Sequence, residues 1–129
     1  MHESNQFNLT VVTRVSSKVT DYPSPIKTIQ VPDDYPHDKV VEAFRGNDAV
    51  VLAIGFAGEH HLPALARASV EAGVKRLIAS GFGVDVSNEA AAEVFPVAAN
   101  KVAMIKDLKS LEQPGWSWTD VACGVFLDL

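Results

Sequence analysis

Lys101 draws attention because it interrupts an apolar stripe on a segment with helical periodicity. The pattern predicts a helix from about Val97 to Leu111. At about 100° per residue, Ile105 and Leu108 fall on either side of Lys101. The stripe is widened by Val97, Ala98 and Met104. A lysine in this setting either extends past its apolar neighbours to water or faces a cleft, where it could transfer a proton as a general acid or base.

A second candidate follows the β-branched segment Leu9–Thr13, which predicts a strand. In a doubly wound dinucleotide-binding fold, the group near the end of the second strand selects between NAD and NADP. Arginine suits a 2′-phosphate because its planar, permanently charged fork bonds the phosphate bidentately. The candidate NADP contacts are therefore Thr13, Arg14, Ser17 and Lys18. The spacing leaves a second interpretation open, in which Arg14 and Lys18 are solvated loop residues.

Two apolar segments, Ala49–Gly55 and Val74–Ser80, predict buried strands of a parallel sheet. Ligands of such sheets bind beyond the carboxyl ends of the strands, so Gly55, Phe56 and Ser80 are further candidate cofactor contacts. A plain turn explains the glycine equally well. We predict no metal site, because the chain has no Cys/His cluster.

The remaining segments place these residues in an α/β fold. A strand is expected at Ile26–Val31, helices at about 37–45 and 60–73, and a last strand at Trp116–Gly124. The order strand, strand, helix, strand, helix, strand, helix, strand predicts a parallel sheet. We expect residues 1–129 to form one domain, an incomplete Rossmann-like doubly wound parallel sheet.

The expected fold lacks its first strand and its glycine-rich turn. No G-x-G-x-x-G occurs in the chain, and only eight residues precede Leu9. A strand, turn and helix need roughly 25 residues, so we expect that unit to lie outside this polypeptide. Its strand is normally central, and its loss would leave two sheet fragments with bare edges. Copies of the chain could associate through those edges as a homo-oligomer.

Composition excludes several classes of protein. The net charge is −5 without a basic block, which argues against nucleic-acid binding through phosphate contacts. The single cysteine excludes a disulfide framework. The polar start of the chain and the lack of a long apolar run argue against a signal peptide and a membrane span, so a cytoplasmic location is expected.

Five segments together resemble the NmrA-like and isoflavone-reductase-like proteins, which are atypical short-chain dehydrogenases. These segments are VTRVSSK, GNDAVVLAIG, EAGVKRLIASGFGVD, PVAANKVAMIKDL and WSWTDVACGVFLDL. The resemblance runs in collinear order from about Glu3 to Leu129, and it implies that the chain is truncated at both ends relative to the family. It also implies that NADP is the cofactor.

The resemblance assigns a catalytic role to Lys101, the lysine on the helix after the segment Phe82-Gly83-Val84-Asp85. Many relatives carry a glutamate before that phenylalanine, whereas this chain has Gly81. The implied function is NADP-dependent reduction of a small metabolite, including those of secondary metabolism. The alternative is a non-redox protein that has lost cofactor binding: an NmrA-like regulator, a small-molecule-binding protein or an isomerase.

Overall fold

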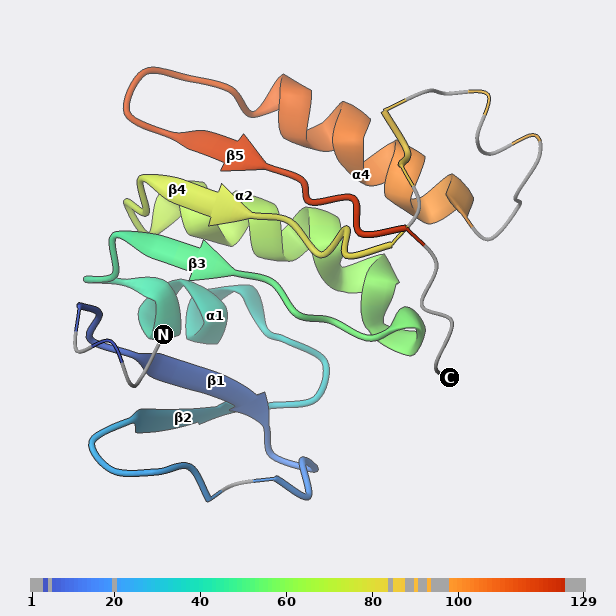
Figure 1. The fold of residues 1–129 in the computed structure, drawn as a ribbon. Coiled ribbons are helices and arrows are strands. Elements are labelled where there is room, and N and C mark those ends of the chain that lie inside the picture. Colours follow the sequence, from blue (N-terminus) through green and yellow to red (C-terminus); the bar gives the residue numbers. More distant parts are fainter. Residues whose placement is uncertain are drawn as a thin grey trace.

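The structure is a computed structural model that describes residues 4, 6–19, 21–83, 85–87, 90, 93 and 98–124. Its strands form two parallel sheets (Figure 1). In the first, β1 (Thr10–Arg14) pairs with β2 (Lys27–Val31). In the second, β4 (Arg76–Ile78) lies between β3 (Ala49–Val51) and β5 (Ser117–Thr119). The predicted parallel α/β fold is confirmed, and Figure 1 shows the carboxyl ends of all these strands at the same side of the molecule.

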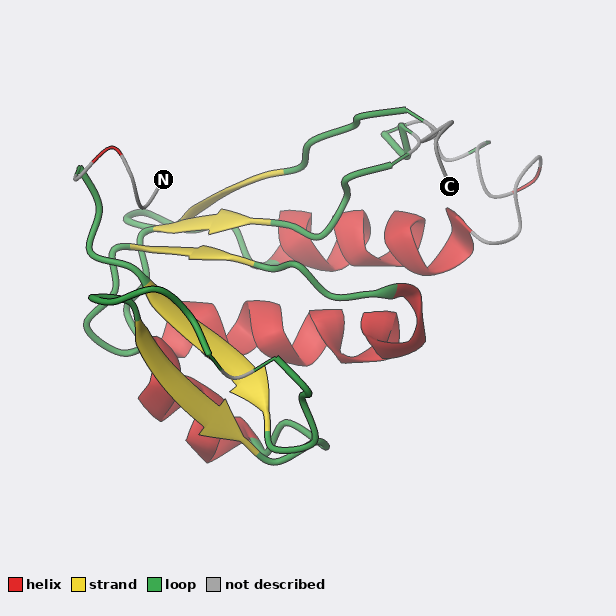
Figure 2. Ribbon diagram, turned by 60° about the horizontal axis from the view of Figure 1, so that its bottom comes forward, coloured by secondary structure: helices red, strands yellow, loops and turns green. Residues whose placement is uncertain are grey.

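Helices cover one face of the two sheets (Figure 2). They are α1 (His37–Phe44), α2 (Leu62–Glu71) and α4 (Ala99–Ser110). A 3₁₀ segment, η2 (Phe56–His61), leads into α2, which carries Pro63 in its first turn, where proline is tolerated. The helix predicted from residue 60 therefore begins at Leu62, after a tighter turn.

The core lies between the sheets and these helices. Leu77 and Ala79 are fully buried, and both belong to the large cluster of apolar side chains contributed by all three helices. Val12 of β1 packs against the same cluster, so the smaller sheet shares the core. The indole of Trp116 donates a hydrogen bond to Ser69 Oγ at 3.1 Å inside it.

Three strands are shorter than their apolar segments predict. The segment from Ala49 to Gly55 forms a strand only as far as Val51. Near its end, Ile54 N–H donates to Ser80 Oγ at 3.1 Å, and the Ser80 hydroxyl donates to Ile54 O at 3.0 Å. A side chain thus replaces the backbone ladder here, because one hydroxyl both accepts and donates a hydrogen bond.

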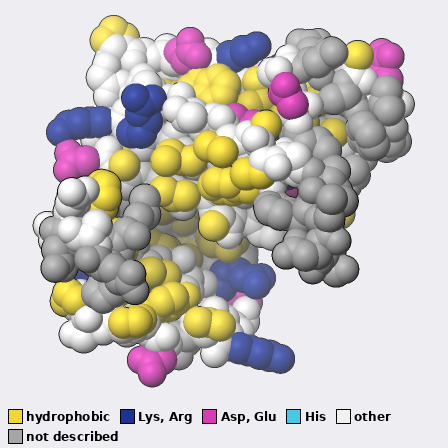
Figure 3. Space-filling view, viewed as in Figure 1, with side chains coloured by type: hydrophobic (Ala, Val, Ile, Leu, Met, Phe, Trp, Pro, Cys, Tyr) yellow, Lys and Arg dark blue, Asp and Glu magenta, His cyan; other side chains and the backbone are white. Residues whose placement is uncertain are grey.

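The two sheets confirm the predicted pair of fragments with bare edges. The hydrogen bonds of β1 go to β2 and those of β3 go to β4, and no strand of the described residues lies between β1 and β3. Val51 on the edge strand β3 is 45% exposed. Figure 3 shows hydrophobic side chains gathered across the middle of the face that the helices leave open.

The helices give no support for a membrane span. Within the described part of the chain, none of them combines the length and the apolar character that crossing a bilayer requires.

Candidate functional site at the carboxyl ends of the strands

The Lys101 side chain reaches the loop that follows β4. Its Nζ donates a hydrogen bond to Gly81 O at 2.6 Å and lies 3.7 Å from Oε1 of Glu59. Only 18% of the side chain is exposed. On the same helix, Met104, Ile105 and Leu108 are buried as the stripe predicts, whereas Val97 lies outside the described residues. Lys101 therefore points along the apolar stripe to the edge of the sheet, and its ammonium contacts protein groups there.

Glu59 is a neighbour of Lys101 that the sequence pattern did not indicate. It lies in η2, and its side chain is only 4% exposed. Its Oε2 atom is buried and has no hydrogen-bond partner among the residues that the structure describes. Burial of a carboxylate is costly unless a cation or hydrogen-bond donors compensate for the lost water, so Lys101 is the group that makes this position tolerable.

Asp120 brings a second carboxyl group to the same loop. A Cβ atom at position 81 would overlap Oδ1 of Asp120 unless that flexible side chain moved, so the Asp120 carboxylate takes the space that a side chain at position 81 would occupy. Burial raises the pKa of Asp120, and the charge of Asp85 adds to this effect. A hydrogen bond from the Val121 backbone and the charge of Lys101 oppose it only in part. Oδ1 of Asp120 is also buried and has no partner within the described part of the chain.

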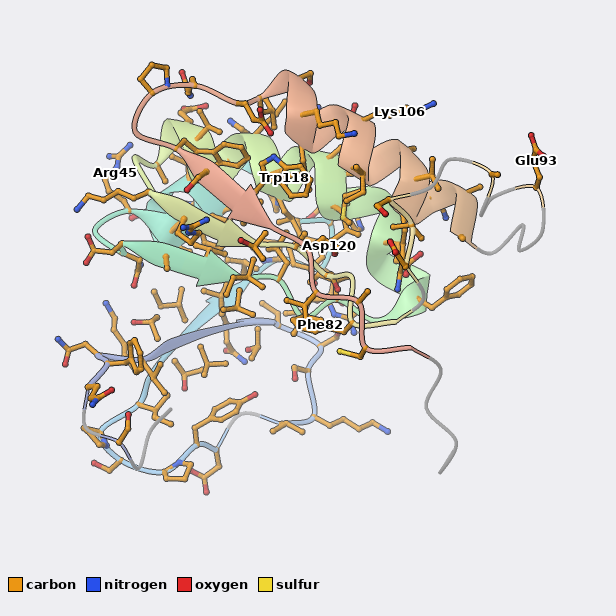
Figure 4. The ribbon with its side chains drawn as sticks, turned by 45° about the horizontal axis from the view of Figure 1, so that its top comes forward. Arg45, Phe82, Glu93, Lys106, Trp118 and Asp120 are labelled. Carbon is orange, nitrogen blue, oxygen red and sulfur yellow. The ribbon has the colours of Figure 1, made fainter. Side chains whose placement is uncertain are left out.

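The loop from Gly81 to Gly83 is held from both sides. Beyond the Lys101 contact, Gly83 O accepts hydrogen bonds from Cys123 N at 3.0 Å and Gly124 N at 2.9 Å. Between the glycines, Phe82 has a φ of 32°, which costs energy for a residue with a Cβ atom. Figure 4 shows Phe82 and Asp120 beyond the ends of the strands, with Arg45 at the opposite end of the sheet.

Of the predicted cofactor contacts in this region, Ser80 is buried and its hydroxyl is engaged with Ile54. Its observed role is to join the ends of β3 and β4. Gly55 precedes η2, and no atom lies within 4 Å of the place where its Cβ would be. Phe56 is 65% exposed at the start of η2. Gly55 and Phe56 are accessible to a ligand, and the role of all three residues as cofactor contacts stays a prediction.

The second group of predicted residues lies at the end of β1. Arg14 ends the strand with an exposed side chain, and Lys18 is exposed in the following turn. The hydroxyl of Ser17 donates to Val19 O at 3.1 Å. Thr13 Oγ1 is buried and has no partner in the described residues. This end of the strand thus offers one exposed guanidinium and one unsatisfied hydroxyl.

The charge of Arg14 acts on two titratable groups, Asp33 and His61. Ser16 N donates to Asp33 Oδ1 at 3.0 Å; hydrogen bonds from Ser16 lower the pKa of Asp33, and the charge of Arg14 adds to this effect. The ring of His61 meets Tyr35 edge-on, with 4.8 Å between ring centroids. Burial lowers the pKa of His61, and the charges of His60 and Arg14 add to this effect, whereas the charge of Asp34 opposes it.

The described residues contain no cluster of His, Cys, Asp and Glu suited to a metal ion. Two hollows of about 350 and 360 Å³ lie elsewhere, along the start of β1 and between β2 and α1. Neither lining includes Arg14 or Lys101. The structure places these two residues at the same side of the sheets and does not join them in either hollow.

Comparison with known proteins identifies relatives along the whole chain. Residues 1–128 match the family model described as NAD(P)H-binding. Oxidoreductase aprR of Aspergillus flavus is 33% identical over 130 residues, which cover 100% of this chain and 43% of the relative.

A solved structure, "AtPrR2 with NADP+ and (+)pinoresinol", superimposes with a TM-score of 0.57 at 26% identity. The match covers 75% of this chain and 32% of that chain. The chain therefore spans less than half the length of each of these two relatives.

Proposed function

Because the chain belongs to the NAD(P)H-binding family, with the NmrA-like and isoflavone-reductase-like proteins, we propose that it functions as an NADP-dependent oxidoreductase that acts on a small metabolite. One observation carries the proposal. The ammonium of Lys101 lies beyond the carboxyl end of β4, at the edge of the sheet where α/β proteins bind their ligands. Arg14 ends β1 at the same side of the molecule.

The residues at the end of β1 suit the adenosine side of NADP. Arg14 would bond the 2′-phosphate with its charged fork. Thr13 precedes Arg14 on β1, and its hydroxyl would reach the cofactor only if this buried oxygen became exposed on binding. Ser17 and Lys18 would contribute from the following turn. Gly55 and Phe56 would border the cofactor at the end of β3, where the glycine allows close approach of the backbone.

Lys101 would supply the proton for the reduction. When bound, NADPH supplies a hydride, and the product then needs a proton at the acceptor atom. An ammonium has three N–H donors, of which Gly81 O takes one and Glu59 faces another. The remaining donor can approach a substrate beyond the sheet, where it would act as a general acid.

The substrate in this proposal is a small organic molecule, in keeping with the pinoresinol named in the solved relative. A cytoplasmic location and the absence of nucleic-acid and membrane partners belong to the same proposal. Strands β1 and β3 are each paired on one side only within the described part of the chain. Their free edges support association of copies through these strands.

Fluorescence titration of the purified chain with NADPH and NADH tests the cofactor assignment. We expect tighter binding of NADPH and a loss of this preference by roughly tenfold in Arg14→Ala, since a charge-assisted hydrogen bond contributes about 1.5–3 kcal/mol. Arg45→Ala, which removes a guanidinium at the opposite end of the sheet, is the control and should change neither affinity.

Failure to bind NADPH at millimolar concentration would reject the proposal for this chain. Thermal unfolding in the presence of candidate metabolites would then examine the non-redox alternative. That alternative predicts a melting temperature raised by a metabolite and unchanged by NADPH.

A further inference from the structure

Glu59 and Lys101 form an ion pair that differs in kind from the surface pairs of this protein. The Lys39 Nζ to Glu42 Oε2 distance is also 3.7 Å, but those side chains are 56% and 77% exposed. In the Glu59 pair the exposed fractions are 4% for the acid and 18% for the lysine. Water screens the first pair and has little access to the second, so only the buried pair should fix its lysine strongly.

The two partners come from different elements. Glu59 lies in η2, which follows β3, and Lys101 lies in α4. The ammonium is further held by Gly81 O, in the loop that follows β4. Three separate segments therefore meet at one nitrogen atom, and the pair determines where that nitrogen lies relative to the sheet.

The buried carboxylate also limits where the ammonium can go. Among the described residues, Lys101 is the cation that lies within 4 Å of the Glu59 carboxylate, and Oε2 of that carboxylate has no hydrogen-bond partner there. An uncompensated buried charge is far more costly than a lost surface pair. Glu59 thus favours one rotamer of Lys101, the one that reaches Gly81.

We propose that Glu59 is the positioning residue of Lys101, which holds the ammonium against the Gly81 carbonyl at the edge of the sheet. The proposal extends the function proposed above, in which Lys101 donates the proton. Glu59 itself is too buried to meet a substrate and acts through the lysine.

Competitive acetylation of lysines, quantified residue by residue by mass spectrometry, tests this without requiring turnover. In the unaltered protein we expect Lys101 to react several times more slowly than Lys39. Glu59→Gln keeps the size and removes the charge, and we expect it to speed the reaction of Lys101 by roughly fivefold. Glu42→Gln makes the same change at the exposed pair and should alter Lys39 by less than about twofold.

Equal rates for Lys101 and Lys39 in the unaltered protein would overturn the proposal, as would an unchanged Lys101 rate in a folded Glu59→Gln variant. Glu59→Asp keeps the charge, so Lys101 in this variant should label as slowly as in the unaltered protein. A merely structural role for Glu59 does not predict that the charge alone sets the labelling rate. If Glu59→Gln does not fold, equal rates for the two lysines in the unaltered protein would still overturn the proposal. Because labelling needs no cofactor, a lack of NADPH binding would reject the proposed function and leave this result intact.

Discussion

At the scale of single residues, Asp120 yields a prediction with a definite sign. Its pKa in the folded chain is raised above the ordinary value of 3.8, chiefly by burial. The folded protein therefore binds this proton more tightly than the unfolded chain, and the stabilisation is complete below pH 3.8 and lost as pH rises through the raised pKa. Near pH 7 the ionised carboxylate is destabilising, so Asp120→Asn should raise the free energy of unfolding by roughly 0.5 kcal/mol, given partial exposure to solvent.

Urea unfolding at pH 7 and at pH 3 measures this effect, and the gain should vanish at the lower pH. Asp48→Asn is a control of opposite sign, because a hydrogen bond from Lys75 Nζ at 2.7 Å lowers the pKa of Asp48. The contribution of Asp48 is present above pH 3.8 and lost as pH falls through its lowered pKa. A loss of stability in Asp120→Asn at pH 7 would contradict the assignment of burial as the dominant cause.

The sequence predicted Lys101 and not its two acidic neighbours, for a physical reason. The apolar stripe that singles out Lys101 is local to one helix, and helical periodicity makes it visible. The approach of Glu59 and Asp120 depends on the meeting of η2, α4 and the segment after β5, which no local pattern encodes. The one available signal was Gly81 in place of the relatives' glutamate, because a missing side chain leaves room for another group.

At the scale of elements, Ser80 joins the segments that follow β3 and β4. Its hydroxyl is the partner of both polar backbone groups of Ile54, and its side chain is buried. Ser80→Ala leaves these two groups unsatisfied, which should lower the free energy of unfolding by about 1–3 kcal/mol. Ser110→Ala removes an exposed hydroxyl that donates to Asp107 O at 2.6 Å, and it should cost less than about 0.5 kcal/mol.

Chemical unfolding of both variants measures the two losses, and equal losses would show that the buried hydroxyl contributes no more to stability than the exposed one.

Ser80 also bears on which element boundaries the sequence could predict. The sequence predicted the five strands of the described residues, and the alternation of strands with helices predicted their parallel pairing. Strands β3 and β4 end at Val51 and Ile78, before the predicted ends at Gly55 and Ser80, and beyond them the Ser80 hydroxyl bonds the backbone of Ile54.

At the scale of the whole molecule, the separation into two sheets leaves facing strand edges whose backbone groups need partners. Val51 lies on one of these edges and is 45% exposed. If copies associate through the edges, a charged side chain there should weaken association, since lysines on edge strands block pairing.

Sedimentation velocity over a concentration series should show association of the unaltered chain and a shift toward monomer in Val51→Lys. Val121→Lys places the same charge on a residue that is 38% exposed and outside the strands, and it should leave association unchanged. A well-folded unaltered chain that stays monomeric at every concentration would contradict association through the edges, and equal effects of the two lysines would assign it to general charge repulsion.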